Sequence, residues 1–127
     1  MSVVLFNLYN MAEHNELGKN GEDYAYEYLL KKGFDILDRN WRPPERELQG
    51  DLDLVARLDD LIVFCEVKAR RSDDFGGAAA AVGTRKRQQV RRLAESWLRE
   101  RTPGEIDVRF DVIAIDGVAV THYAAAF

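Results

Sequence analysis

The sequence contains few of the residues that build disulfides, zinc sites, nucleophilic triads or membrane spans. Its single cysteine, Cys65, excludes an intramolecular disulfide and a zinc site built from cysteines. The two histidines, His14 and His122, have no cysteine or serine partner at a recognisable spacing. No run approaches the roughly 18 consecutive apolar residues of a membrane span, and the first residues lack the basic start of a signal peptide. We therefore expect no membrane partner and a location in the reducing cytoplasm.

The composition is typical of a folded globular domain, but the charge is unevenly distributed. The 127 residues suit one domain, and 46% of them are hydrophobic and 31% charged. The formal net charge is −4, which argues against a non-specific nucleic-acid-binding protein. Residues 68–92 nevertheless carry 8 Lys and Arg against 2 Asp and Glu, whereas residues 1–67 carry 7 against 14 and residues 93–127 carry 3 against 6. This basic block indicates either a polyanionic partner or a solvated helix face with internal ion pairs.

Hydrophobic periodicity predicts a single mixed α/β (α+β) domain over residues 15–127, preceded by a loosely ordered leader over residues 1–14. The helices are expected over residues 15–32 and from Thr84 to about residue 102, and the strands over residues 34–38, 51–58, 61–68, 107–115 and 118–123. The resulting order, α-β-β-β-α-β-β, predicts a small mixed sheet flanked by helices.

The two strands expected over residues 51–68 form the most informative part of the chain. If residues 59–60 make a two-residue turn, Asp53 lies directly opposite Glu66 on the neighbouring strand. Side chains of directly opposed residues share one face of a sheet, with their Cβ atoms about 4.5–5.5 Å apart. Lys68 follows Glu66 by two residues, so the alternation of a strand puts it on the same face.

This register gathers two carboxylates and one ammonium group on one side of a hairpin. Like charges directly opposite each other destabilise a sheet, and the strand that carries Glu66 is otherwise apolar, which makes unpaired charge costly. A hard divalent cation with oxygen ligands would relieve the repulsion between Asp53 and Glu66. The alternative is a structural ion-pair network, in which Lys68 pairs with both acids or with Asp51.

The same residues resemble a known signature. Asp53, twelve intervening residues and the tripeptide Glu66-Val67-Lys68 resemble the PD-(D/E)xK signature of the restriction-endonuclease-like superfamily. Other motifs occur in the same order along the chain; they are Gly21-Glu22, Arg39-Asn40-Trp41, Gly50-Asp51-Leu52-Asp53, Arg70-Arg71, Phe75-Gly76-Gly77, Lys86 and Arg109-Phe110-Asp111-Val112. By these motifs the chain is identified as a member of the YraN family of small bacterial endonuclease-like proteins, which is similar to archaeal Holliday-junction resolvases.

The resemblance implies a restriction-endonuclease-like core and a nuclease that depends on Mg²⁺ or Mn²⁺ and acts on DNA. It assigns Asp53 and Glu66 as metal ligands and Lys68 as the catalytic lysine. By the resemblance Glu22 takes the place of a helix acid that completes many such sites, whereas the sequence alone favours an ordinary surface glutamate. The segment Gly50–Asp53 departs from the usual Gly-Glu-Ile-Asp of the family but keeps its last aspartate.

Basic residues on both sides of residues 72–83 are candidates for contact with phosphate groups. They are Arg85, Lys86, Arg87, Arg91 and Arg92 at the start of the second predicted helix, and Arg70 and Arg71 directly after the strand of Glu66. Cationic side chains release condensed counterions when they neutralise phosphates. The alternatives are a solvated helix face and pairing with nearby aspartates. Trp41 either stacks on an unpaired base or is buried beside the loop that follows it.

These observations lead to one main hypothesis and two alternatives. The main hypothesis is a metal-dependent nuclease that hydrolyses DNA phosphodiester bonds and selects branched or single-stranded DNA, because so short a chain has little surface for reading bases. The first alternative is a non-catalytic nucleic-acid-binding module that retains the fold. The second is a structural domain whose acids and lysine form ion pairs. A homodimer is expected by analogy with resolvases, which act on two-fold symmetric junctions.

Overall fold

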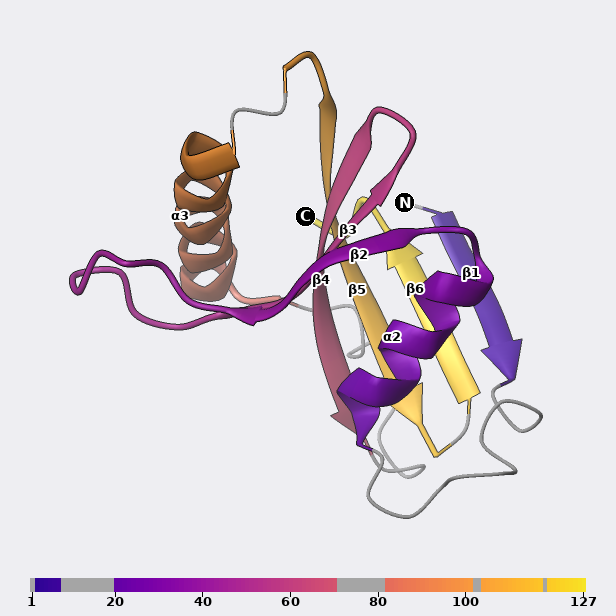
Figure 1. Cartoon of the computed structure of the whole chain (residues 1–127). Coiled ribbons are helices and arrows are strands. Elements are labelled where there is room, and N and C mark those ends of the chain that lie inside the picture. Colours follow the sequence, from indigo (N-terminus) through magenta and orange to yellow (C-terminus); the bar gives the residue numbers. More distant parts are fainter. Residues whose placement is uncertain (1, 8–19, 71–81, 102–103, 118) are drawn as a thin grey trace.

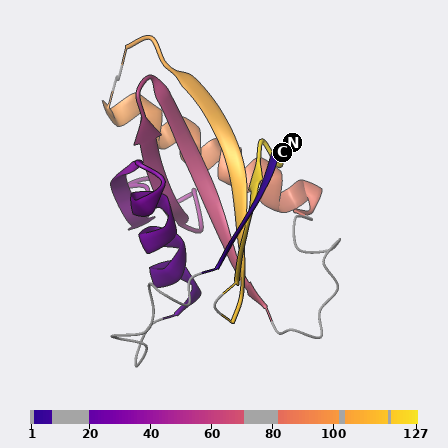
Figure 2. The same cartoon turned by 90° about the vertical axis from the view of Figure 1, so that its right-hand side faces the viewer.

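In the described part of the chain, two helices cover opposite faces of a six-stranded sheet, as the computed structural model shows (Figures 1 and 2). The structure describes residues 2–7, 20–70, 82–101, 104–117 and 119–127. The elements are β1 (Ser2–Asn7), α2 (Gly21–Lys31), β2 (Asp35–Trp41), β3 (Leu52–Leu58), β4 (Leu61–Arg70), α3 (Thr84–Arg101), β5 (Asp107–Asp116) and β6 (Ala119–Ala124). This architecture confirms the predicted mixed α/β class.

The sheet is mixed, and its strand order is β1-β6-β5-β4-β3-β2. β4 and β5 run parallel, whereas each of the other neighbouring pairs is antiparallel. Parallel neighbours need a crossover connection, and α3 lies between β4 and β5 in the chain. The antiparallel pairs β3–β4 and β5–β6 are hairpins, as the sequence predicts.

Successive side chains of β4 point to opposite faces of the sheet, one covered by α2 and the other by α3. This alternation determines the face on which the candidate catalytic residues lie. Cys65 packs in the core beneath α2 with Leu29, and Phe64 packs in the core beneath α3 with Trp97. Cys65 is a packed core thiol, and burial raises its pKa well above the usual value. Glu66 follows Phe64 by two residues on the strand, so it lies on the same face, which is the α3 side of the sheet.

Hydrogen bonds join the C-terminal half of α3 to β2. Asp38 accepts hydrogen bonds from Trp97 Nε1 at 2.7 Å and from Arg101 Nη2 at 2.9 Å. The Arg101 guanidinium also lies 4.7 Å from the centre of a Trp97 ring and 5.8 Å from that of Trp41. Trp41 is thus partly buried against the core beneath α3, the second of the two outcomes considered for it.

The register predicted for the central hairpin is confirmed. The turn occupies residues 59–60, and the ladder between β3 and β4 reaches the pair Leu54↔Cys65. This pairing is the one that places Asp53 opposite Glu66, one step beyond the last pair of the ladder. Asp53 and Glu66 lie just beyond the end of this ladder, and the charge of Asp53 acts on Glu66, so the two candidate metal ligands are neighbours.

The prediction of a loosely ordered leader over residues 1–14 is wrong for residues 2–7. These residues form β1, which pairs antiparallel with β6 from Ser2↔Ala124 to Asn7↔Ala119. The run Ser-Val-Val-Leu-Phe-Asn is rich in residues that favour strands, and β6 would otherwise expose its backbone at the sheet edge.

The first helix begins later than the apolar spacing predicts. Asn20 is extended, with ψ −177°, and its side chain accepts a hydrogen bond from the Asp23 backbone amide at 3.1 Å. Asp23 in turn accepts one from the Asn20 amide, also at 3.1 Å, so the two residues form a capping box and α2 starts at Gly21. The other residues of the expected first turn, 15–19, lie outside the described residues.

Candidate active site

The candidate site lies where β3 and β4 stop pairing with each other. Beyond Leu54↔Cys65 the ladder ends, and the backbone amide of Val67 donates to Asp53 Oδ2 at 2.9 Å. β3 remains paired with β2 as far as Leu52, so at this point β3 loses only its backbone pairing with β4. A side-chain oxygen of Asp53 therefore takes the place of a backbone acceptor at the point where the two strands part.

Glu66 is the most constrained of the candidate ligands. Its side chain is buried, with 7% of the residue exposed, and Oε1 has no hydrogen-bond partner. Oε2 lies 3.5 Å from Nζ of Lys86, which comes from the first turns of α3. Burial and the neighbouring charge of Asp53 raise the pKa of Glu66 to about 7, even though Lys86 lowers it. The site thus holds one carboxyl that titrates near neutral pH.

Asp53 shares the electrostatic conflict of Glu66. Burial raises its pKa, the hydrogen bond from the Val67 amide lowers it, and the negative charge of Asp51 raises it again. The net shift is upward, so the folded chain disfavours the ionised form of Asp53. Burial and like charges thus raise the pKa values of both Asp53 and Glu66, and the charge of Lys86 offsets only part of this rise.

Glu22, in the first turn of α2, lies close enough to Asp53 for the two charges to interact. The helix approaches β4 so closely that a Cβ on Gly21 would lie 2.9 Å from Cβ of Ala69, so a side chain at Gly21 would push the helix away. The Oε1 atom of Glu22 is buried and has no hydrogen-bond partner. Burial and the charge of Asp53 raise the pKa of Glu22, and Arg39 lowers it. We call the set Glu22, Asp53 and Glu66 the carboxylate fork.

The sequence did not single out Asn40 for the site, although it supports Glu22. A hydrogen bond from the Asn40 side chain is among the influences that lower the pKa of Glu22. Asn40 has φ +50°, in the left-handed region, which asparagine tolerates better than most residues. In the sequence, the position of Asn40 near the end of a predicted strand was the available indication of this role. The preceding residue, Arg39, forms an ion pair of 2.8 Å with Asp23 of α2.

The carboxylate fork has the donor chemistry of a Mg²⁺ or Mn²⁺ site. Two of its carboxylate oxygens, on Glu22 and Glu66, are buried without a partner, and each of its three pKa values is raised. Among the described residues, no three His, Cys, Asp or Glu side chains form a group that could hold a metal ion. Mg²⁺ usually keeps several waters and binds through one or two carboxylates and substrate phosphates. The residues present fit that kind of open site.

The predicted catalytic lysine, Lys68, lies on β4 in the expected place. It is partly buried, it follows Glu66 by two residues, and its register partner on β5 is Ala114. Strand alternation therefore puts it on the same face as Glu66. Arg71 lies outside the described residues, and so does the side chain of Arg70 at the end of β4.

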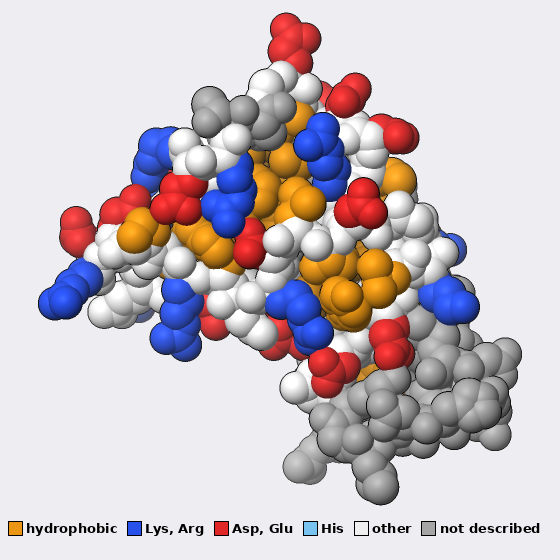
Figure 3. All heavy atoms as spheres, viewed as in Figure 1, with side chains coloured by type: hydrophobic (Ala, Val, Ile, Leu, Met, Phe, Trp, Pro, Cys, Tyr) orange, Lys and Arg blue, Asp and Glu red, His pale blue; other side chains and the backbone are white. Residues whose placement is uncertain are grey.

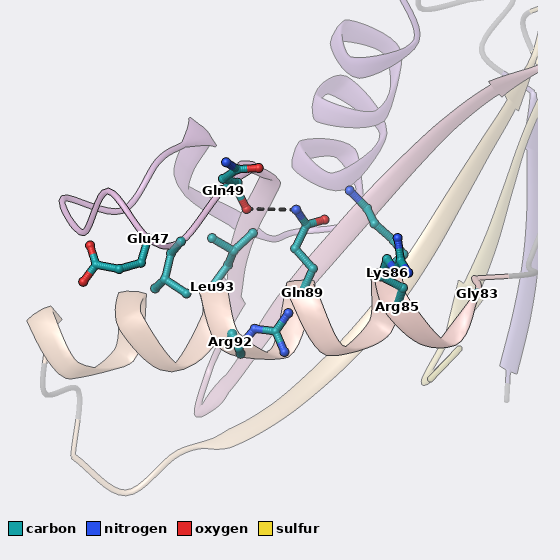
Figure 4. A pocket seen from close by; sticks show the side chains of 9 residues that line it. Glu47, Gln49, Gly83, Arg85, Lys86, Gln89, Arg92 and Leu93 are labelled. Atoms are coloured by element: carbon teal, nitrogen blue, oxygen red, sulfur yellow. Dashed lines mark hydrogen bonds between the residues drawn. The ribbon is translucent and has the colours of Figure 1, made fainter.

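The structure divides the predicted basic cluster of α3 into separate groups. Arg85, Lys86 and Arg92 line a pocket of about 570 Å³ between α3 and residues 47–49 (Figure 4). Arg87 donates from Nε to the Val82 carbonyl oxygen at 2.7 Å. Arg91 lies elsewhere, with its guanidinium 4.8 Å from the ring centre of Phe110. The five residues do not form one phosphate-binding face.

A second polar cluster, which the sequence did not reveal, lies in the core. Asp111 is fully buried and accepts two hydrogen bonds from Arg109, each of 2.8 Å, and one from the Ala125 amide. Its Oδ2 also lies 2.6 Å from His122 Nε2, and the Tyr28 hydroxyl lies 2.8 Å from Nδ1 of the same ring. Every polar group of this cluster has a partner, so it ties α2, β5 and β6 together.

The charges on the surface are mixed. Figure 3 shows acidic and basic side chains interspersed over the face that carries α2, with apolar side chains visible between them. This face is no continuous basic surface, so contact with a polyanion would depend on local groups of arginine and lysine. Of the helices within the described residues, none has the length and apolar character needed to cross a membrane.

Comparison with known proteins places the chain among relatives of similar length. The sequence model of the uncharacterised protein family UPF0102 matches residues 21–115. A UPF0102 protein of Frankia casuarinae is 43% identical over 122 residues, which cover 92% of this chain and 100% of the relative. One of Rhodococcus opacus is 46% identical over 105 residues, covering 83% and 86%. One of Dictyoglomus thermophilum is 39% identical over 102 residues, covering 80% and 83%.

Proposed function

The chain belongs to the uncharacterised protein family UPF0102, and from its carboxylate fork we propose that it is a divalent-metal-dependent nuclease that hydrolyses DNA phosphodiester bonds. The observation that carries the proposal is the Glu66 carboxyl, which is buried beside Asp53 with Oε1 unpartnered and with its pKa raised to about 7. A fold does not keep such a costly arrangement for stability, and a cation would relieve it. The resemblance to the PD-(D/E)xK signature supports the same conclusion.

Each residue of the site has a distinct role in this proposal. Asp53 and Glu66 would hold Mg²⁺ or Mn²⁺, with Glu22 beside them. When bound, the ion would polarise the phosphate and lower the pKa of a water molecule. Lys86 favours the ionised form of Glu66, and the hydrogen bond from Val67 fixes the orientation of Asp53.

Lys68 would serve the reaction from the same face of β4. Its ammonium group would orient the attacking water or stabilise the negative charge that develops on the phosphate. A lysine two residues after a metal-binding glutamate is placed for either task because strand alternation carries both side chains to one face.

The substrate expected of this site is branched or single-stranded DNA. The chain is short, its net charge is −4, and its basic side chains form small groups. Such a surface supports a few phosphate contacts, which position a nucleic acid without reading its sequence. The shape of the DNA is then the main property that the protein can recognise.

Cleavage of labelled junction, flap, single-stranded and duplex DNA in Mn²⁺ tests the proposal. Asp53→Asn is expected to lower the cleavage rate at least about a hundredfold, because a ligand oxygen of the ion is lost. Lys68→Ala is expected to lower it as well. The matched control is Asp59→Asn in the turn of the same hairpin, where φ is +53° and asparagine is equally acceptable.

The controls separate the nuclease from the alternatives. Cleavage that is lost in Asp53→Asn and Lys68→Ala but kept in Asp59→Asn supports the nuclease. DNA binding without cleavage of any substrate would overturn it in favour of the non-catalytic module. Equal cleavage by all four proteins would point to a contaminating enzyme and would overturn it too.

A further inference from the structure

The pocket beside the carboxylate fork has walls of two different kinds. Figure 4 shows it between α3 and the segment that carries Glu47 and Gln49. Leu93, which is fully buried, contributes an apolar wall, and Leu48 of the segment lines the pocket too. Its volume of about 570 Å³ falls within the range of about 300–1,000 Å³ typical of pockets for small organic ligands.

The polar groups of the pocket suit a nucleotide. Arg85 and Lys86 lie at one end and Glu47 at the other (Figure 4). The Arg92 guanidinium adds a third cation to the lining. Guanidinium groups bind phosphate oxygens in a bidentate manner, whereas a carboxylate repels them. The phosphates of a ligand would therefore lie at the end with Arg85 and Lys86, and Glu47 would limit how far a strand can extend.

An amide group faces the same space. Gln89 donates from Nε2 to the Gln49 carbonyl oxygen at 2.8 Å, which leaves its Oε1 as an acceptor. A Cβ on Gly50 would lie 2.6 Å from this Nε2, and Gly50 has φ +100°, so glycine is required for the segment to close against α3. The amide is held against residues 49–50, which suits it to contact the edge of a base.

The pocket is joined to the carboxylate fork by one side chain. Lys86 lines the pocket and also forms the 3.5 Å ion pair with Glu66. Asp51, whose charge raises the pKa values of Glu66 and Asp53, follows Gln49 of the pocket lining by two residues in the chain. A phosphate close to Lys86 would thus lie between the pocket and the proposed metal ligands.

We propose that this pocket binds one unpaired nucleotide of a single-stranded DNA segment, next to the phosphodiester bond that is cleaved. The inference rests on the proposed function and names its substrate more closely. Leu48 would contact the base, Gln89 its edge, and Arg85 and Arg92 the phosphates. A paired base lies inside the duplex stack and would first have to leave it, so the pocket selects unpaired nucleotides.

Binding measured in EDTA tests this inference without any cleavage. Fluorescence anisotropy would compare a labelled single-stranded dodecamer with the same strand annealed to its complement. We expect the single strand to bind more tightly. Arg92→Gln should weaken its binding about fivefold and reduce the slope of affinity against salt by about one, as loss of one phosphate contact does.

Arg91→Gln is the matched control, because it makes the same charge change on the same helix outside the pocket. Duplex binding as tight as single-strand binding would overturn the inference, and so would equal losses in the two arginine variants. Nuclear magnetic resonance gives a second readout. The side-chain amide signal of Gln89 should shift on addition of the single strand, and an unshifted signal contradicts the pocket.

The two proposals fail in different ways. If single-strand binding follows the predicted pattern but no DNA is cleaved in Mn²⁺, the proposed nucleotide pocket is supported and the proposed nuclease activity is overturned. If DNA is cleaved in a way that depends on Asp53 but duplex and single strand bind equally, the proposed nuclease activity is supported and the proposed nucleotide pocket is overturned.

Discussion

Replacing Asp111 with alanine is expected to lower the free energy of unfolding by about 3–5 kcal/mol. Asp111 is fully buried and accepts hydrogen bonds from Arg109, His122 and the Ala125 amide. Burial raises its pKa, but these hydrogen bonds outweigh burial, so its pKa lies below the usual value and it is ionised at neutral pH. Without the carboxylate, the partly buried Arg109 and the buried His122 lose their partner.

The geometry also fixes the direction of the hydrogen bonds in this cluster. A carboxylate oxygen only accepts, so His122 donates to Asp111 from Nε2. Nδ1 of the same ring is hydrogen-bonded to the Tyr28 hydroxyl, whose pKa burial raises to about 12. Removing Asp111 therefore disturbs three elements of the fold at once.

Urea unfolding followed by tryptophan fluorescence measures this loss. Asp107→Ala, an exposed aspartate at the start of the same strand, is the control and should change stability by less than about 0.5 kcal/mol. A loss below about 1 kcal/mol in Asp111→Ala would contradict the stabilising role of the cluster.

Glu66→Gln is expected to stabilise the metal-free chain at high pH. The pKa of Glu66 is about 7 in the folded chain and has an ordinary value of 4.5. The folded state therefore binds this proton more tightly than the unfolded state. The stability it contributes is complete below the unfolded pKa and is lost as pH rises through 7. Glutamine resembles the protonated acid at every pH, so the variant does not lose that stability.

Thermal unfolding in EDTA at several pH values measures the effect. At pH above the folded pKa the variant should be more stable by up to about 3 kcal/mol, because one pKa unit corresponds to about 1.4 kcal/mol. At acidic pH the two proteins should be equally stable. A variant that is less stable than the original chain at high pH would show that the Lys86–Glu66 pair outweighs burial, and would contradict an upward shift of the Glu66 pKa.

The sequence was sufficient for the parts of the site that depend on local patterns. The turn at residues 59–60 fixed the hairpin register as far as Leu54↔Cys65, and Asp53 and Glu66 are the next residue on each strand. Strand alternation put Lys68 on the same face as Glu66 without any knowledge of what packs there. These predictions succeeded because turn length and a period of two are properties of a few neighbouring residues.

The features that the sequence could not supply depend on contacts between distant elements. Lys86 meets Glu66 only because α3 crosses the sheet above β4, and the apolar spacing of α3 says nothing about that crossing. The Tyr28 hydroxyl meets the ring of His122 across 94 residues of chain. Likewise β1 is a strand because β6 offers it an edge.

Two other differences between the sequence predictions and the structure have a local origin. The capping box of Asn20 and Asp23 can be read from the sequence, but apolar spacing alone extends the helix through it to residue 15. Arg91 and Arg92 belong to one basic block in the sequence, which suggests a shared face. On a helix, neighbours in sequence point about 100° apart, and the two arginines accordingly have different surroundings.

The most direct test of the carboxylate fork is a calorimetric titration with Mn²⁺ at pH 8, where Glu66 is ionised. We expect that the chain binds Mn²⁺, that Asp53→Asn does not bind it measurably, and that Asp59→Asn binds it as the original chain does. A chain that binds no Mn²⁺, or an Asp53→Asn variant that binds it unchanged, would contradict the proposed metal site.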